Sequence, residues 1–155
     1  MADRKKATAA RHRTPKALDA IRSASRAALP DFITPQLATL VDKAPAGDAW
    51  LHEIKLDGYR TAARMESGKV RMLTRKGLDW TERFAPIAQA LAKLPTRAAY
   101  LDGEMVVLGK DGVSSFADLQ DALSTGQSGR LSYYVFDLLH LDGHDLLGHQ
   151  LAPGL

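Results

Sequence analysis

The stretch WLHEIKLDGYR, residues 50–60, says more about fold and chemistry than any other part of this sequence. It sets Lys55 between apolar neighbours and follows it with Asp57, Gly58 and Arg60. Burial beside apolar side chains, or a second cation, lowers the pKa of a lysine and frees its lone pair for nucleophilic attack. Asp-Gly is also a common hairpin turn, so the same residues are typical of a plain strand-turn-strand hairpin. Taken alone, the motif favours the hairpin, because short motifs match by chance.

The composition is that of one folded domain. The chain has 155 residues, of which 45% are apolar and 25% charged, as expected of a globular protein with a core. It has no cysteine, which excludes disulfides, zinc–thiolate sites and thiol catalysis and fits a reducing cytoplasm. No apolar run approaches the roughly 20 residues that cross a bilayer, and the N-terminus lacks the apolar core of a secretory signal. We expect a cytoplasmic location, no membrane partner and, from five scattered histidines, no histidine metal site.

Charge divides the chain near residue 30. Residues 1–29 hold eight Lys/Arg and two acids, which leaves the rest of the chain at −3 although the whole carries +3. A basic tail can dock on nucleic-acid phosphates through counterion release, and it is equally typical of a solvated linker. We assign residues 1–30 as a basic tail or linker and residues 31–155 as the folded part.

Strands dominate the pattern and arrive as hairpins with helices between them. Strands are predicted over residues 50–55, 59–65, 70–74, 99–108 and 131–141. Helices are predicted over residues 16–28 and 79–94 and in a short segment capped by Ser115. Residues 31–50 predict an extended segment on the domain surface. No βαβ alternation is visible, so the fold class is α+β with largely antiparallel sheets.

Two later strands carry candidate site residues. Glu104 lies among apolar neighbours in YLDGEMVVL, residues 100–108, where a carboxylate either faces solvent or meets a partner such as a ribose hydroxyl or a metal-bound water. Phe136 lies in YYVFDLLHLDG, residues 133–143; core packing is its default interpretation and stacking on a nucleobase is the sharper one. Residues 55–83 hold eight bases and four acids, which is typical either of a face that follows a phosphate backbone or of a solvated sheet face.

Four ordered motifs resemble those of ATP-dependent DNA ligases. EIKLDGYR, residues 53–60, is similar to the adenylation motif of that family, and LTRKG, DGE and FDLLHLDG follow in the family's order. The chain from about Asp31 to Leu147 closely resembles the ligase domains of bacterial ligase D enzymes, which are multidomain end-joining proteins. Four motifs in order are far more specific than one, so they favour Lys55 as a nucleophile. The resemblance implies a partial ATP-grasp-like nucleotidyltransferase domain.

The same resemblance implies an enzyme that uses ATP with Mg²⁺ (or Mn²⁺) and acts on nicked or broken double-stranded DNA in repair and recombination. In that family the lysine attacks the α-phosphorus of ATP, pyrophosphate leaves, and the lysyl-AMP activates a 5′-phosphate at a nick. By position, the resemblance assigns Lys55 as the nucleophile, Glu53 to the adenine amino group, Arg60 to ribose or phosphate, Arg75 to AMP or the nick phosphate, Glu104 to the ribose hydroxyl and Phe136 to the adenine ring. Asp57 belongs to the motif without an assigned role, and no residue is assigned as a metal ligand.

The sequence departs from the family in two places. Lys76 stands where the family usually has Asn in an Arg-Asn-Gly turn, which predicts an altered loop because lysine is a poor left-handed residue. The family's later glutamate and Lys-x-Lys motifs and its OB-fold domain are not in the sequence.

From these departures we expect residues 31–155 to be an N-terminal part of an adenylation domain that adenylates weakly or not at all alone, with another chain or domain supplying the missing motifs. Two alternatives stay open. One is an RNA ligase or capping-type nucleotidyltransferase, and the other is an inactive DNA-binding fragment.

Overall fold

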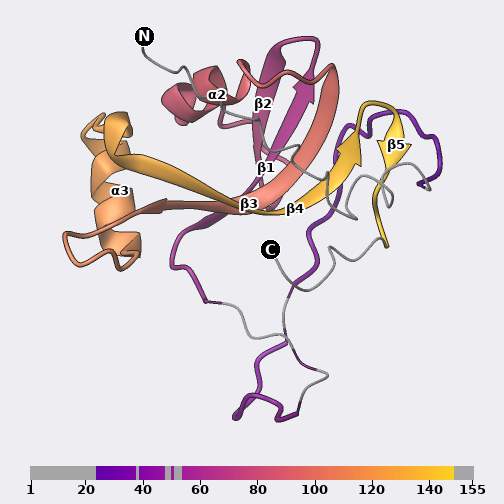
Figure 1. Ribbon diagram of the computed structural model, residues 1–155. Coiled ribbons are helices and arrows are strands. Elements are labelled where there is room, and N and C mark those ends of the chain that lie inside the picture. Colours follow the sequence, from indigo (N-terminus) through magenta and orange to yellow (C-terminus); the bar gives the residue numbers. More distant parts are fainter. Residues whose placement is uncertain (1–23, 38, 48–49, 51–53, 149–155) are drawn as a thin grey trace, which may run out of the picture.

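The structure is a computed structural model that describes residues 24–37, 39–47, 50 and 54–148. Its frame is a five-stranded sheet with the strand order β2-β1-β3-β4-β5, in which every neighbouring pair is antiparallel (Figure 1). The strands are β1 Tyr59–Glu66, β2 Lys69–Thr74, β3 Ala98–Val107, β4 Leu131–Leu141 and β5 His144–Asp145. The helices are α2 Ala85–Leu91 and α3 Phe116–Ser124, with a 3-10 turn at Ser128–Arg130. The predicted α+β class with a largely antiparallel sheet is confirmed.

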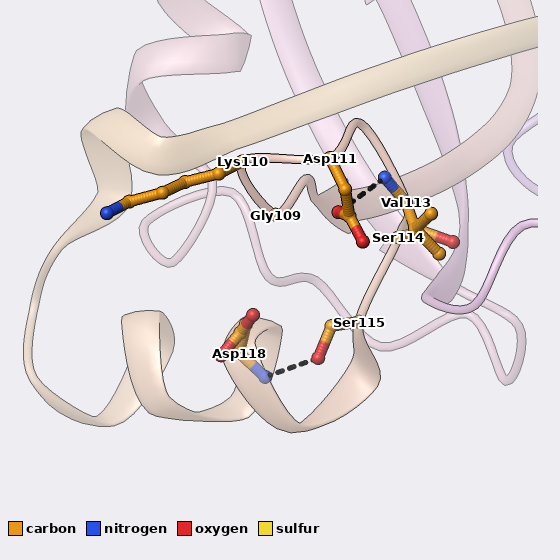
Figure 2. Close-up of a pocket in the computed structure, with 7 residues that line it drawn as sticks. All are labelled: Gly109, Lys110, Asp111, Val113, Ser114, Ser115 and Asp118. Atoms are coloured by element: carbon orange, nitrogen blue, oxygen red, sulfur yellow. Dashed lines mark hydrogen bonds between the residues drawn. The ribbon is translucent and has the colours of Figure 1, made fainter.

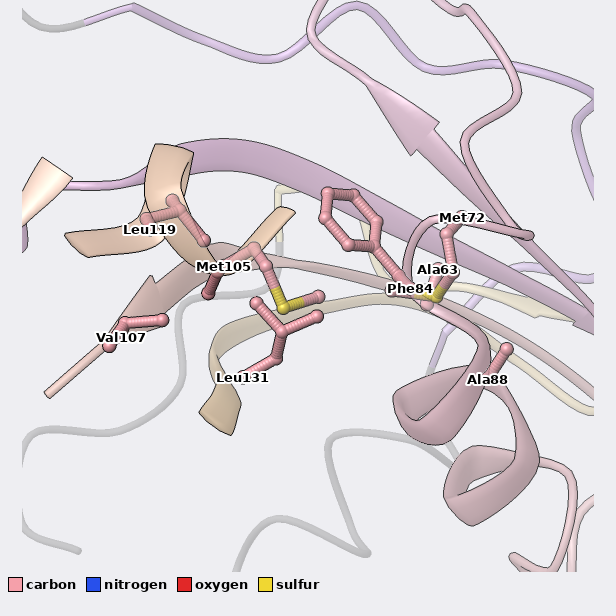
Figure 3. Packing of buried hydrophobic residues seen from close by; sticks show 9 residues of the cluster. Ala63, Met72, Phe84, Ala88, Met105, Val107, Leu119 and Leu131 are labelled. Atoms are coloured by element: carbon pink, nitrogen blue, oxygen red, sulfur yellow. The ribbon is translucent and has the colours of Figure 1, made fainter. Parts of the chain in front are cut away.

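One face of the sheet builds the main core. Strand side chains alternate between the two faces, so Ala63, Met105 and Val107 point to the same side and meet Phe84 and Leu119 from the helical segments. Figure 3 shows Leu119 of α3 close to Met105, and Phe84 at the start of α2 beside Met72. All six of these side chains are fully buried, and each large one contributes roughly 1.5–3 kcal/mol by leaving water.

The opposite face is only partly covered. Ala62, Leu73 and Tyr100 form a second cluster there, and Leu29 and Ile33 of the N-terminal segment cover it. The backbone N–H of Ile33 donates to Tyr100 Oη at 3.0 Å, which fixes the segment on the sheet. The described residues between 31 and 47 contain no helix or strand, and Ile33 packs on the sheet as the predicted surface segment requires, whereas Leu37, Leu40 and Val41 are largely exposed.

The predicted helix over residues 79–94 is wrong in its length. The structure has only Ala85–Leu91 as helix, with Pro86 in its first turn. Proline is favoured at a helix start and disrupts a helix interior, so a helix running through Pro86 from residue 79 is disfavoured. The second predicted helix is confirmed, since Ser115 Oγ accepts a hydrogen bond from the N–H of Asp118 at 3.2 Å and caps α3.

The predicted helix over residues 16–28 is wrong in the part that the structure describes. Residues 24–28 are not helical. The N–H of Ala27 donates to the carbonyl of Gly143 at 3.0 Å, and Arg26 forms a β-bridge with His144. Pairing with the β4–β5 hairpin therefore outweighs the helix propensity of the alanines. Residues 16–23 lie outside the described part of the chain, as does most of the proposed basic tail.

Strand β4 is interrupted by two bulges. Asp102 pairs with Asp137, but the next residue of β3 pairs with Val135. Phe136 is therefore an extra residue in β4, and a second irregularity follows at Leu139. A β-bulge bends the strand and redirects a side chain, and such bulges are common beside active sites.

Candidate active site

A pocket opens on the uncovered half of the second sheet face. Its cavity volume is about 490 Å³. The loop before β1 forms one wall, and strands β1, β3 and β4 form the other. It is lined by four of the predicted site residues, Lys55, Arg60, Glu104 and Phe136, and by Asp57 and Asp137. The fold thus brings residues from three ordered motifs to one place, although they lie up to about 80 residues apart in the chain.

Strand register and the bulge explain this convergence. Arg60 of β1 is the direct partner of Glu104 in β3, so both side chains lie on the same face. Asp102 lies two residues before Glu104 and therefore shares that face. The bulge then sets Phe136 beside them from β4. The sheet therefore holds Arg60, Glu104 and Phe136, whereas Lys55 comes from the loop before β1.

Arg60 is held by a fork of hydrogen bonds and by an aromatic ring. Its Nε and Nη2 donate to the two carboxylate oxygens of Asp102, both at 2.8 Å. Its Cζ lies 4.3 Å from the centroid of the Phe136 ring, a cation–π contact. The bond to Asp102 raises the pKa of Arg60, so the guanidinium stays charged. Its geometry is fixed before any ligand arrives.

Asp102 is a site residue that sequence reasoning missed. Its side chain is only 6% exposed, against 27% for that of Arg60. A carboxylate so deeply buried requires a charged or hydrogen-bonding partner. The signal was present in DGE, because residues 102 and 104 share a strand face, but only Glu104 was singled out. Asp137, which also lines the pocket, was missed as well.

Glu104 carries a perturbed carboxyl group. Burial raises its pKa above the ordinary glutamate value, and the nearby charges of Asp102 and Asp57 raise it further. The charges of Arg60 and Lys55 act in the opposite direction. Glu104 therefore lies among charges of both signs, and the positive charge of Lys55 interacts electrostatically with its carboxylate.

Lys55 lies in a different environment from the one expected. Its side chain is exposed, and Ile54 beside it is 88% exposed, so the prediction of burial between apolar neighbours is wrong. Lys55 nevertheless lines the same pocket as Glu104 and Phe136. The side chain of Lys55 is thus exposed to solvent, and it lines a pocket that Glu104 of β3 also lines.

The segment before β1 is a loop. Strand structure was predicted over residues 50–55, but Trp50, Ile54 and Lys55 are not in a strand. Glu53, the predicted adenine-binding residue, lies outside the described residues with positions 51 and 52. The structure leaves its placement untested.

The Asp-Gly pair after Lys55 is not a hairpin turn. Gly58 does not have the positive φ of such a turn, whereas Gly68 (φ 79°) in the β1–β2 hairpin does. A Cβ at Gly58 would overlap the carbonyl oxygen of Met105. Glycine at position 58 therefore allows the loop to lie directly against β3.

Arg75 is not part of the pocket. It is exposed and follows Thr74, the partner of Thr61 at the end of β2. This register puts Arg75 at the same end of the sheet as Arg60, beyond the lining residues. Lys76 does not take the left-handed conformation, which Gly77 adopts instead (φ 77°), so the strain on which the prediction of an altered turn rested is not present.

Three of the eight bases over residues 55–83 are paired with acids within the protein. Besides the Arg60 pair, Arg64 contacts Glu66 at 3.0 Å and Arg71 contacts Asp79 at 3.0 Å. These arginines are therefore not free to contact a phosphate backbone.

In the part of the chain that the structure describes, no cluster of three or more His, Asp or Glu residues is arranged to hold a metal ion. No described helix is both long enough and apolar enough to span a bilayer.

Comparison with known proteins identifies the family. The family model "ATP dependent DNA ligase domain" matches residues 33–153. The chain belongs to this family. It is 45% identical over 135 residues to the multifunctional non-homologous end joining protein LigD of Pseudomonas aeruginosa, covering 86% of this chain and 16% of that protein. It is 38% identical over 119 residues to LigD of Mycobacterium tuberculosis, covering 76% of this chain and 15% of that protein.

Solved ligase D structures share the fold. The crystal structure of the ligase domain of M. tuberculosis LigD superposes with a TM-score of 0.56 at 40% identity, covering 63% of this chain and 32% of that one. A mycobacterial DNA ligase D complexed with ATP and MES gives a TM-score of 0.57 at 38% identity, with the same coverage. The resemblance inferred from four sequence motifs is confirmed. The chain spans about a sixth of the two LigD proteins it matches.

Proposed function

We propose that this chain is the lysine-bearing part of an ATP-dependent DNA ligase domain of the end-joining type, in which Lys55 takes up AMP from ATP. One observation carries the proposal: Lys55, Arg60, Glu104 and Phe136 line one pocket, although only Lys55 and Arg60 are near neighbours in the chain. A lysine with only a structural role would not require an arginine, a carboxylate and an aromatic ring in the same pocket. A covalent nucleotidyl transfer needs an amine, a charged group for the phosphates, an acceptor for the ribose and a surface for the base.

The proposed first step exchanges one bond at phosphorus for another. The neutral Nζ of Lys55 attacks the α-phosphorus of ATP and forms a P–N bond. The bond to the bridging oxygen of pyrophosphate breaks, pyrophosphate leaves, and the amine releases a proton to solvent. The AMP then passes to the 5′-phosphate at a DNA nick, and the 3′-hydroxyl displaces it. Arg60, fixed by Asp102, offers the charge on which phosphate or ribose oxygens would settle.

The remaining roles follow from position in the pocket. The carboxylate of Glu104 would accept a hydrogen bond from the ribose hydroxyl, and Phe136 would stack on adenine. Glu53 and Arg75 keep their proposed roles, on the adenine amino group and on the AMP or nick phosphate. We further propose a partial ATP-grasp-like domain over residues 31–155, a tail or linker over residues 1–30, and a chain or domain that supplies further ligase motifs.

The described residues do not build a resident metal site. Mg²⁺ (or Mn²⁺) is therefore proposed as part of the substrate, bound to the triphosphate, which fits the preference of Mg²⁺ for substrate phosphates with one or two carboxylates. Nicked or broken double-stranded DNA is the proposed acceptor. It is the substrate class expected from the family and from the end-joining relatives.

Incubation with ATP labelled at the α-phosphate tests the proposal. The chain, with Mg²⁺, should slowly gain one adenylyl group on Lys55, detectable by mass spectrometry of the Lys55 peptide. Lys55→Arg should lose it and keep the fold, as checked by thermal unfolding. Label at another residue, or equal label in Lys55→Arg, would contradict the proposal. Transfer from GTP in preference to ATP would instead favour a capping-type enzyme.

A further inference from the structure

The loop that carries Lys55 is tied to the beginning of α3. The backbone N–H of Asp57 donates to Ser114 Oγ at 2.8 Å. In return, Asp57 Oδ2 accepts a hydrogen bond from the N–H of Phe116 at 3.3 Å. Within the described part of the chain, these are the side-chain hydrogen bonds that hold residues 54–58. One residue, Leu56, separates Asp57 from Lys55, so the position of the lysine depends on these two hydrogen bonds.

The anchor at α3 is itself fixed to the core. Ser114 forms a β-bridge with Leu108, just beyond the end of β3. The N–H of Ser115 donates to the carbonyl of Val107 at 3.1 Å. Leu119 of α3 is fully buried in the main core. Figure 2 shows Ser114 beside Val113 on the segment that leads into α3, and Ser115 at the start of the helix with its hydroxyl directed at the N–H of Asp118.

The two adjacent serines thus have different tasks. Ser115 caps α3, and its hydroxyl makes no hydrogen bond to the Lys55 loop. Ser114 has no capping bond in α3 and holds the Asp57 N–H. The contact of Gly58 with β3 limits the loop from the other side. The hydroxyl of Ser114 and the carboxylate of Asp57 thus make two hydrogen bonds that connect the loop to the start of the helix.

We propose that Ser114 is a positioning residue for the nucleophile: its hydroxyl holds the Asp57 backbone and thereby keeps Lys55 at a fixed place on the pocket wall. This inference rests on the proposed nucleophilic role of Lys55. It also gives Asp57 a role that the motif alone did not reveal, because its carboxylate accepts the hydrogen bond from the N–H of Phe116. A nucleophile displaced by about 1 Å can lose about 100-fold in rate, so a single distal hydroxyl is able to control the transfer step.

Three variants of the whole chain test this inference. Ser114→Ala removes the acceptor of the Asp57 N–H, Ser114→Thr retains a hydroxyl, and Ser115→Ala is the matched control that removes only the helix cap. Amide hydrogen exchange at Asp57 should become about fivefold faster in Ser114→Ala, corresponding to one lost hydrogen bond. It should stay unchanged in Ser115→Ala and be restored in Ser114→Thr.

The adenylation rate supplies the functional readout. In Ser114→Ala the rate of Lys55 labelling at saturating ATP should fall about tenfold or more, with the half-saturating ATP concentration unchanged. Ser114→Thr should recover most of the rate, and Ser115→Ala should lower the unfolding temperature without this loss. Equal effects of the two alanine variants, a change only in half-saturation, or unaltered exchange at Asp57 would overturn the inference. Equal labelling of Lys55→Arg and the unaltered chain would instead refute the proposed function, and the exchange comparison would still decide whether Ser114 holds the loop.

Discussion

The guanidinium of Arg60 lies over the ring of Phe136, with its Cζ 4.3 Å from the ring centroid. Asp102 fixes the guanidinium there through two hydrogen bonds, so the contact is a built feature of the site. A nucleobase that stacks on Phe136 must use the opposite ring face or displace the guanidinium. The contact therefore links recognition of the base to the position of the cation that would meet the phosphates.

Replacing the ring should weaken ATP binding. Stacking of a base on an aromatic side chain contributes roughly 1–3 kcal/mol, so Phe136→Leu should weaken ATP binding by about 5- to 150-fold in a calorimetric titration. Val135→Ala, which alters an exposed residue of the same strand whose partner Gly103 lies on the opposite sheet face from Glu104, is the control and should bind ATP as before. Equal affinities for the Phe136→Leu variant and the unaltered chain would exclude stacking on this ring.

Removing Asp102 should cost more stability than removing a surface partner. Asp102→Ala leaves Arg60 without its fork in a largely buried place, and we expect a loss of about 2 kcal/mol in urea unfolding. Asp121→Ala breaks the ion pair with Arg130, whose two side chains are about half exposed, and should cost under about 1 kcal/mol. The prediction fails if the two variants unfold at the same urea concentration.

Glu104 should make stability depend on pH in the mildly acidic range. Burial raises the pKa of Glu104 in the folded protein above its unfolded value. The group therefore adds stability below the unfolded pKa, and that contribution is lost as pH rises through the folded pKa. Glu104→Gln should accordingly gain stability relative to the unaltered chain as pH increases from about 4 to 7 in a urea series. Glu82→Gln, at an exposed position, is the comparison. Parallel stability curves for Glu104→Gln and the unaltered chain would contradict the assigned cause.

A methyl group at Gly58 should damage both stability and the site. It would overlap the Met105 carbonyl, which belongs to the backbone and cannot turn aside, so Gly58→Ala should lose about 2 kcal/mol or more. Gly129→Ala is the matched control, because no atom lies within 4 Å of a Cβ there. It should leave stability unchanged or raise it slightly. Identical melting temperatures for the two variants would show that the loop can move away from β3.

Local patterns predicted most of the sheet. Alternation and turn residues placed β1 to β4 within about two residues, because strand formation here follows side-chain period and turn chemistry. The wrong length of α2 was avoidable, since Pro86 was visible in the sequence. The loop at residues 54–58 was not predictable in this way. Its shape depends on Ser114 and Met105, which lie about 50 residues away, and no local pattern reports such a contact.

The sequence predicted which residues form the site, but it did not predict how their side chains contact one another. Ordered motifs named Lys55, Glu104 and Phe136, and the pocket contains all three. Their motifs could not show that Asp102 holds Arg60, because that pairing depends on the register of two strands. Nor could they show the open surroundings of Lys55, since apolar neighbours in the chain do not have to fold over it.

The extra residue in β4 has a consequence for anyone who exchanges parts between related ligases. The aim of the Phe136 ring depends on how many residues lie between the pairs formed by β3 and β4, and not only on which residue is aromatic. A hybrid enzyme joined inside residues 131–141 with one residue deleted would keep every residue of the motifs. It would still turn the Phe136 ring away from Arg60. Junctions placed in the loops on either side of that strand would preserve the count, and with it the orientation.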